Sequence, residues 1–236
     1  MAIYRRVMLK LSGEALSGAN GIFDFAKVAE TAAIIREMTE TGTQIGVVIG
    51  AGNIWRGRQG PAANMDAVTA DQMGMLGTVI NCLCMADALR KEGLKVNVMS
   101  AVDMDRFCEP FHAMTAREYL EAGRVVLFAA GSGNPFFSTD TAVALRAAEV
   151  EAEAILMAKN IDGVYTADPR TDPTATLIRD ISYQEAMNRG LKVMDAAAFA
   201  LCMEQHVPVV RVFGLDDPRN LVKVLQGDGM GTVVHP

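Results

Sequence analysis

The chain has 236 residues, 50% of them hydrophobic and 21% charged, so it is long enough to bury a core of its own, and we expect a single domain spanning residues 1–236. Its formal net charge of -6 lacks the excess of cations that attracts a phosphate backbone, which argues against a nucleic-acid partner. No apolar run approaches the roughly eighteen residues of a membrane span, and the cysteines and histidines show no zinc-site spacing, so we expect a cytoplasmic protein with no membrane partner and no metal bound by its side chains.

Short β-branched apolar runs alternate with longer helical patterns along the chain. They predict strands at residues 7–11, 44–49, 96–99, 124–128, 154–157 and 209–213. The spacing between the runs requires crossover helices, which is typical of an α/β fold with a mostly parallel sheet sandwiched between helices. Ligands of such sheets bind outside the carboxyl ends of the strands, so we expect functional residues directly after strands.

Two helices are predicted by apolar residues at three- and four-residue intervals. The first runs from Phe25 to Met38 and precedes Gly42, and the second runs from Met73 to Ala86 and precedes Gly93. The apolar stripe of the second helix is rich in methionine, and we interpret it as core packing rather than as a cofactor site.

Glycine-containing loops follow the first two predicted strands. The first strand runs into Lys10 to Gly13, where a lysine and backbone amides can face phosphates, although a lysine at a strand edge is also structurally ordinary. The second strand ends in Gly50 to Asn53, and Arg56 follows. Glycines let the backbone approach a ligand and arginine can clamp phosphate oxygens, but a tight turn with a solvated arginine explains this pattern equally well.

Residues 131–140 contain the densest cluster of candidate binding residues, with two glycines, hydroxyl and amide side chains and an aspartate. Ser138 or Thr139 is predicted to cap a helix over 139–150, whose start favours an anion. Capping alone would explain the hydroxyls, but the Gly-x-Gly-Asn-Pro-Phe-Phe segment before the cap favours a binding function. Further along, Asp162 to Pro169 either closes a hairpin or contacts a base and its sugar, and the residues leave both readings open.

Several familiar catalytic motifs are absent from the sequence. There is no G-x-x-x-x-G-K-[ST] loop and no G-x-S-x-G elbow, and the three histidines are too scattered to predict a triad. A phosphate acceptor is already nucleophilic, so its transfer chemistry needs positioning and charge neutralisation rather than a general base.

Taken together, the ordered motifs resemble the bacterial uridylate kinases, a branch of the amino acid kinase family, over essentially the whole chain. They lie at residues 10–16, 46–57, 71–75, 133–137, 162–169, 192–195 and 231–232. The resemblance implies the carbamate-kinase-like fold and transfer of the γ-phosphoryl group of ATP to UMP, giving UDP and ADP in pyrimidine nucleotide synthesis, with Mg²⁺ accompanying ATP. It also implies a homohexamer activated by GTP and inhibited by UTP.

The resemblance divides the candidate residues between two substrates. Lys10 would neutralise charge on the transferred group, Asp140 would orient Lys10, and Asp71 would accept hydrogen bonds from the ribose of UMP. The implied ATP contacts are Lys10, Leu11, Ser12, Gly13, Gly52, Arg56, Asn160, Tyr165 and Asp168. The implied UMP contacts are Ala51, Asp71, Ser132, Gly133, Asn134, Pro135, Phe136, Phe137, Ser138 and Thr139.

The sequence departs from the family pattern at the end of the strand predicted at 154–157. Met157 stands where relatives often have a lysine, so the sequence leaves open whether a second phosphate-binding lysine exists and how Lys159 and Asn160 align. Two other functions remain possible: a kinase of the same fold that acts on an acyl or carbamoyl oxygen, such as that of glutamate, and a nucleotide sensor without catalysis. Asp71 favours a nucleotide acceptor over the first, and Lys10 with Asp140 favours an enzyme over the second.

Overall fold

The structure is a computed structural model that describes residues 2–19, 21–56, 64–191 and 194–236. Three residues of the motifs above, Gly57, Lys192 and Val193, lie outside the described residues.

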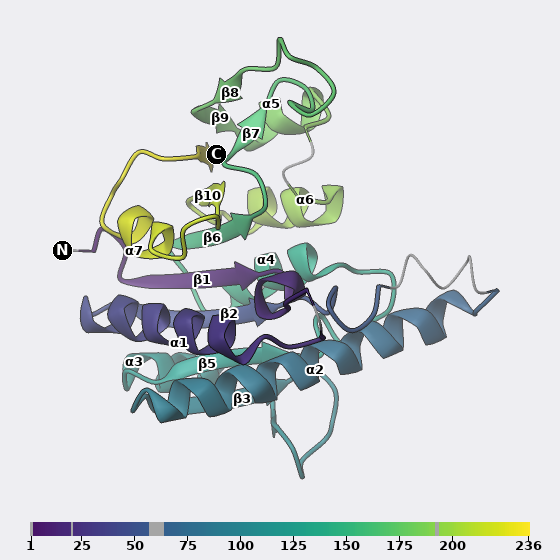
Figure 1. The fold of residues 1–236 in the computed structure, drawn as a ribbon, viewed down its shortest axis with the longest axis vertical. Coiled ribbons are helices and arrows are strands. Elements are labelled where there is room, and N and C mark those ends of the chain that lie inside the picture. The colour runs from purple at the N-terminus through teal and green to yellow at the C-terminus, as the bar shows by residue number, and fades with distance from the viewer. Residues whose placement is uncertain (1, 20, 57–63, 192–193) are drawn as a thin grey trace.

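A nine-stranded sheet with the order β4-β3-β5-β2-β1-β6-β10-β11-β9 forms the centre of the molecule (Figure 1). Neighbouring strands are parallel except β10 and β11, which are antiparallel, so the predicted mostly parallel sheet is confirmed. The strands are β1 (Arg6–Leu11), β2 (Gln44–Ile49), β3 (Val96–Ser100), β4 (Glu109–Pro110), β5 (Val125–Ala129), β6 (Ala154–Lys159), β9 (Asp180–Ser182), β10 (Val210–Gly214) and β11 (Thr232–His235).

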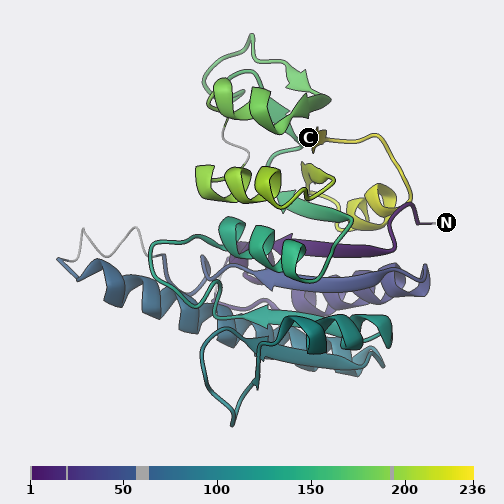
Figure 2. The same cartoon turned by 180° about the vertical axis from the view of Figure 1, so that it is seen from behind.

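Helices cover both faces of this sheet. Helices α1, α2 and α7 lie in front of it in Figure 1, and α3, α4 and α6 lie on the opposite face, seen in Figure 2. The helices are α1 (Phe25–Glu40), α2 (Ala67–Lys91), α3 (Ala113–Glu121), α4 (Thr139–Glu149), α5 (Tyr183–Asn188), α6 (Ala196–Glu204) and α7 (Asn220–Leu225), with a short 3₁₀ helix, η1, at Gly13–Leu16.

The central strands are apolar on both sides because both sides are covered. In β1, Val7 and Leu9 are buried in the cluster that includes residues of α1, α2 and α7, while Met8 is buried in the cluster that includes residues of α3, α4 and α6. Successive strand residues point to opposite faces, so a sheet covered twice requires an almost continuous apolar run. This explains why the strands predicted from such runs are all present within one or two residues of their expected bounds.

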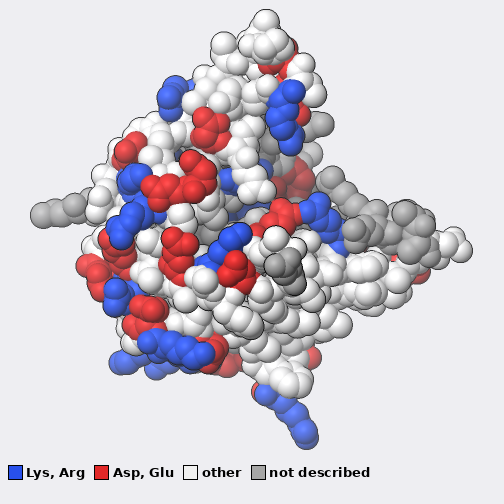
Figure 3. Space-filling view, in the orientation of Figure 1, with Lys and Arg blue, Asp and Glu red and all other residues white. Residues whose placement is uncertain are grey.

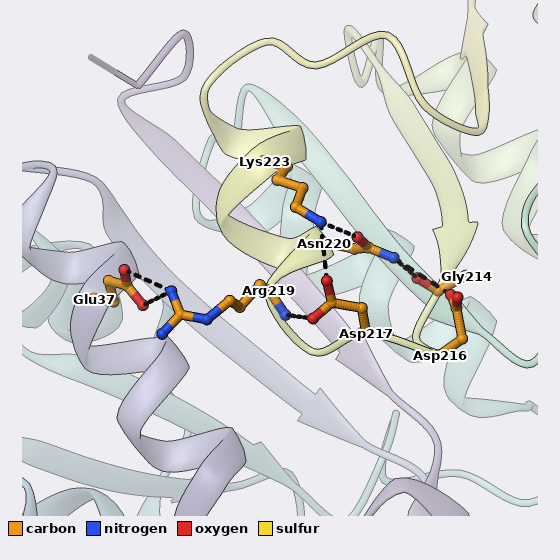
Figure 4. A network of polar contacts seen from close by, with 7 residues as sticks. All are labelled: Glu37, Gly214, Asp216, Asp217, Arg219, Asn220 and Lys223. Carbon is orange, nitrogen blue, oxygen red and sulfur yellow. Dashed lines mark hydrogen bonds and ion pairs between the residues drawn. The ribbon is translucent and has the colours of Figure 1, made fainter.

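The ends of α1 and α7 are joined by polar contacts (Figure 4). Arg219, before α7, is 3.4 Å from Glu37 of α1, and Asn220 donates a hydrogen bond of 3.1 Å to the carbonyl of Gly214 at the end of β10. Asn220 is only 9% exposed, so its amide needs a partner of this kind. The contacts fix α7 to α1 and to the sheet.

The segment Asp162 to Pro169 is part of a hairpin, one of the two readings that the sequence left open. Strand β7 (Val164–Tyr165) pairs antiparallel with β8 (Leu177–Ile178) outside the main sheet. The buried Thr232 of β11 joins this hairpin to the sheet, because its hydroxyl accepts a hydrogen bond from Val164 N and donates one to Ile178 O.

The prediction that the apolar stripe of α2 packs in the core is wrong for its outer residues. Val79 and Ala86 are buried, but Met73, Leu76, Ile80 and Leu83 are 37 to 56% exposed. Figure 3 shows few charges over the middle of α2. This helix is also long and apolar enough to cross a membrane by length and composition alone, and 44% of its most apolar stretch is buried inside the protein.

Candidate active site

Loops that follow β1, β2, β5 and β6 meet at the carboxyl ends of these four strands. These strands are neighbours and run parallel, with Lys10 opposite Val48 on one side and Met157 on the other. Their carboxyl ends therefore bring together segments that are far apart in the sequence, as predicted for ligand sites of α/β sheets.

At these carboxyl ends, the charged centre of the candidate site is Asp140, which lies between two lysines. Asp140 Oδ1 lies 3.0 Å from Lys10 Nζ, and its other oxygen, Oδ2, lies 3.9 Å from Lys159 Nζ. Asp140 Oδ1 is buried and has no hydrogen-bond partner among the described residues, so the nearby lysine balances its charge. The predicted pairing of Lys10 with Asp140 is therefore seen in the structure.

Lys159 supplies a second cation that the sequence left in doubt. Burial lowers the pKa of Lys159, and the positive charge of Lys10 lowers it further, while the carboxylates of Asp140 and Asp195 act in the opposite direction. A lysine in such a position is a poorly solvated charge that an incoming phosphate would stabilise.

A first cavity, of about 620 Å³, opens beside these lysines. Of the residues expected to contact ATP, five line it: Lys10, Ser12, Asn160, Tyr165 and Asp168. Both side chains from the hairpin segment already have partners. Tyr165 donates a 2.8 Å hydrogen bond to Asp162, which raises the pKa of the phenol, and Asp168 forms a paired contact with Arg170.

A second cavity of about 500 Å³ lies at the ends of β2 and β5. Eight of the residues expected to contact UMP line it: Ala51, Asp71, Ser132, Asn134, Phe136, Phe137, Ser138 and Thr139. Asp71 of α2 accepts a 2.7 Å hydrogen bond from Phe136 N, which fixes the loop after β5 against the helix. Since Thr139 lines this cavity and the next residue, Asp140, pairs with Lys10 of the first, the ion pair links the two cavities.

Six expected contact residues line neither cavity. The side chain of Leu11 is buried in the core, so only its backbone can reach a ligand, and Gly13 and Gly52, two more of the six, are packed against each other. Arg56 pairs with Glu14. The remaining two, Gly133 and Pro135, belong to the loop that lines the second cavity.

Ser138 caps α4, as predicted, and is itself held by a residue to which the sequence gave no role. The Ser138 hydroxyl accepts hydrogen bonds from Asp140 N and Thr141 N and donates one to Asp195. Asp195 also accepts from the Thr141 hydroxyl and from Ala198 N, so it caps α6 and joins that helix to α4. Its sequence signal was an aspartate before an apolar helix, which predicts a cap but no contact with α4.

Comparisons with known proteins identify the family and the fold. Residues 5–213 match the model of the family described as "Amino acid kinase family". The structure is similar to that of a UMP kinase from Bacillus anthracis, with 33% identity, a TM-score of 0.93 and coverage of 98% of this chain and 96% of that one. It is also similar to a UMP kinase from Ureaplasma parvum (37% identity, TM-score 0.93, 98% and 99% covered) and to a uridylate kinase from Archaeoglobus fulgidus (26%, 0.73, 97% and 99%).

Proposed function

The chain belongs to the amino acid kinase family, and we propose that it transfers the γ-phosphoryl group of ATP to UMP, giving UDP and ADP in pyrimidine nucleotide synthesis. The similarity to UMP kinases over nearly the full length of both chains supports this acceptor. The observation that carries the proposal is the pair of cavities joined by Lys10 and Asp140.

We assign ATP to the first cavity and UMP to the second. The adenosine would contact the hairpin residues Tyr165 and Asp168, and its phosphates would point toward Lys10 and Lys159. The phosphate of UMP would lie near the start of α4, where the helix dipole favours an anion. The ribose hydroxyls would donate to Asp71.

The two lysines would act on the charge that is transferred. Negative charge spreads over the oxygens of the γ-phosphoryl group as it leaves ADP, and fixed cations stabilise that charge without reorganising. Asp140 would hold Lys10 and Lys159 in place, so that neither has to be ordered when the substrates bind. The phosphate oxygen of UMP attacks directly, so no side chain has to remove a proton.

We propose that Mg²⁺ enters with ATP. No group of three or more potential metal-binding side chains is present in the described part of the chain. Mg²⁺ is commonly held by phosphate oxygens and water with one or two carboxylates, and Asp140 and Asp195 are already engaged by lysine and hydroxyl groups. A chelator should abolish transfer, and added Mg²⁺ should restore it without change in the fold.

An acceptor panel at fixed ATP and Mg²⁺ tests the assignment. UMP should be used at least about a hundredfold better than CMP or AMP, because each base-edge group left unpaired in a buried site costs about 1–3 kcal/mol. Glutamate should not be phosphorylated. Equal rates with UMP and CMP would refute the specificity, phosphorylation of glutamate alone would favour the acyl kinase, and ATP binding without transfer would indicate a sensor.

We further propose that the chain forms one domain and acts in the cytoplasm as a homohexamer activated by GTP and inhibited by UTP. The continuous nine-stranded sheet supports a single domain, and the exposed apolar residues of α2 offer a surface for a second copy. Sedimentation velocity measures the assembly, and rates with added GTP or UTP measure the regulation.

A further inference from the structure

A buried asparagine of α2 holds the loop Gly50 to Asn53, which follows β2. Asn81 is fully buried, in a part of α2 where Val79 and Cys82 are buried as well. A buried carboxamide is stabilising only when its donors and acceptor are satisfied, and the partners of Asn81 are all in this loop.

The hydrogen bonds define the orientation of both amides. Asn81 Nδ2 donates to Gly50 O at 2.7 Å and to Asn53 Oδ1 at 2.8 Å. Asn53 Nδ2 donates back to Asn81 Oδ1 at 3.1 Å and to Ile22 O at 3.0 Å. All four N–H groups are used, and turning the Asn81 amide would place its oxygen against a carbonyl that can only accept.

Two glycines, Gly13 and Gly77, are packed closely against the same loop. A Cβ atom on Gly13 would come 2.6 Å from Gly50 O and 2.8 Å from Gly52 N, and one on Gly77 would come 2.9 Å from Ala51 Cβ. The loop is therefore confined between the phosphate loop after β1 and helix α2. Within this confined space, the hydrogen bonds from Asn81 hold Gly50 and Asn53 directly.

The loop occupies a position between the two proposed substrates. Ala51 lines the second cavity, and Ser12, next to Gly13, lines the first. A group that fixes this loop therefore fixes the distance between the two phosphate sites, on which transfer depends steeply.

We propose that Asn81 is a positioning residue for phosphoryl transfer, acting through the loop Gly50 to Asn53. This inference rests on the proposed function for its kinetic consequence. It goes beyond that function because Asn81 lines neither cavity and acts only by holding the loop that separates them.

The test compares Asn81→Ala and Asn81→Asp with Cys82→Ala. Asn81→Asp keeps the shape but removes both donors, and Cys82 is the next residue of α2, equally buried, with no hydrogen bond to the loop. Per folded molecule, both Asn81 variants should lower kcat by about tenfold to a hundredfold while ATP affinity changes by less than about threefold. Cys82→Ala should lower stability but leave kcat within about twofold.

A double-mutant cycle with Asn53→Ala separates positioning from general destabilisation. If the two amides act through one contact, Asn81→Ala with Asn53→Ala should be hardly slower than the worse single variant, whereas independent effects would multiply. Multiplying effects, or a kcat in both Asn81 variants equal to that of Cys82→Ala, would overturn the proposal.

The fluorescence of Trp55 provides a measurement that does not depend on the reaction. It is the single tryptophan of the chain, lies two residues after the loop and is held by a 2.8 Å hydrogen bond from its indole to Ala70 O. Acrylamide should quench its fluorescence more strongly in both Asn81 variants than in the wild type or Cys82→Ala. Unchanged quenching would overturn the positioning role, whereas a wild type that fails to phosphorylate UMP would refute only the proposed function.

Discussion

Asp140 holds two lysines that belong to different strands, and this sharing determines what each residue contributes. Its Oδ1 is 3.0 Å from Lys10 Nζ, whereas the distance from Oδ2 to Lys159 Nζ is 3.9 Å. The closer pair is the more strongly fixed, so Lys10 is the cation whose position is best defined before substrates bind. Lys159 is the more adaptable of the two.

Lys10→Ala should lower turnover by about a hundredfold or more, since the loss of one charge-stabilising donor costs about 3 kcal/mol in the transition state. Steady-state kinetics with ATP and UMP, with circular dichroism to verify folding, measure the effect. Lys91→Ala is the matched control, because Lys91 lies at the far end of α2 with its side chain 74% exposed. Near-normal turnover of a folded Lys10→Ala variant would contradict the role.

Asp71→Asn should weaken UMP binding by about tenfold or more and leave ATP binding unchanged, because a hydrogen bond to a charged group contributes about 1.5–3 kcal/mol. The asparagine oxygen can still accept the hydrogen bond from Phe136 N, so the loop should keep its position. Calorimetric titration with each nucleotide measures the difference. A loss of ATP affinity with UMP affinity intact would place Asp71 at the other substrate.

Lys159→Met should lower turnover by about tenfold or more and yet raise the midpoint of thermal unfolding. Burial lowers the pKa of Lys159, so its charged form destabilises the folded state. The contribution of this lysine to the free energy of unfolding therefore becomes more favourable as the pH rises toward the unfolded pKa of about 10.4. Methionine fills similar space without the charge, and Asp140 keeps Lys10. Scanning calorimetry at neutral pH measures the midpoint, and a decrease would show that the lysine is a structural partner of Asp140.

At the scale of elements, the sequence predicted those parts of the fold that local composition determines. The six runs of apolar residues became β1, β2, β3, β5, β6 and β10, because strands buried on both faces must be apolar throughout. Strands β4, β7 and β8 have two residues each and leave no periodic signal. Strand β11 pairs antiparallel with β10, which only the tertiary structure defines.

The site shows the same division between local and tertiary information. Ser138 was predicted as a cap because the signal lies within five residues, and the structure confirms it. Asp195 contacts Ser138 across 57 positions of the sequence, and Lys159, at the end of β6, reaches Asp140 of α4. The error about α2 arose because apolar periodicity does not indicate whether the apolar side faces its own core or another molecule.

The loop after β5 provides a prediction at this scale. Gly133 has a φ of 81°, and a Cβ atom there would lie 2.9 Å from Ala101 O. Gly131 has a φ of 59°, but a Cβ atom there meets nothing within 4 Å. Gly133→Ala should therefore raise the KM for UMP about tenfold more than Gly131→Ala does. Gly133→Val should raise this KM further still. Equal effects of the two alanine variants would show that backbone conformation alone matters.

At the scale of the whole molecule, α2 connects the site to the outer surface. Its inner side supplies Asp71 to the second cavity and Asn81 to the loop after β2. Its outer side exposes Leu76 and Ile80. A partner bound on that surface would contact the same helix that positions the acceptor site, which offers a physical route from assembly to activity.

The double variant Leu76→Glu with Ile80→Glu should therefore form an oligomer with fewer copies of the chain. Leu76 is 56% exposed and Ile80 48%, one turn apart on α2, so two copies related by a two-fold axis would bury four such residues. Carboxylates placed there would be desolvated and would repel one another, which should shift the sedimentation coefficient to that of a smaller species at micromolar concentration. Met114→Glu is the matched control, since Met114 is 74% exposed but lies on α3, on the other face of the sheet. If the double variant and the wild type sediment alike, the apolar surface of α2 is not where copies of the chain associate.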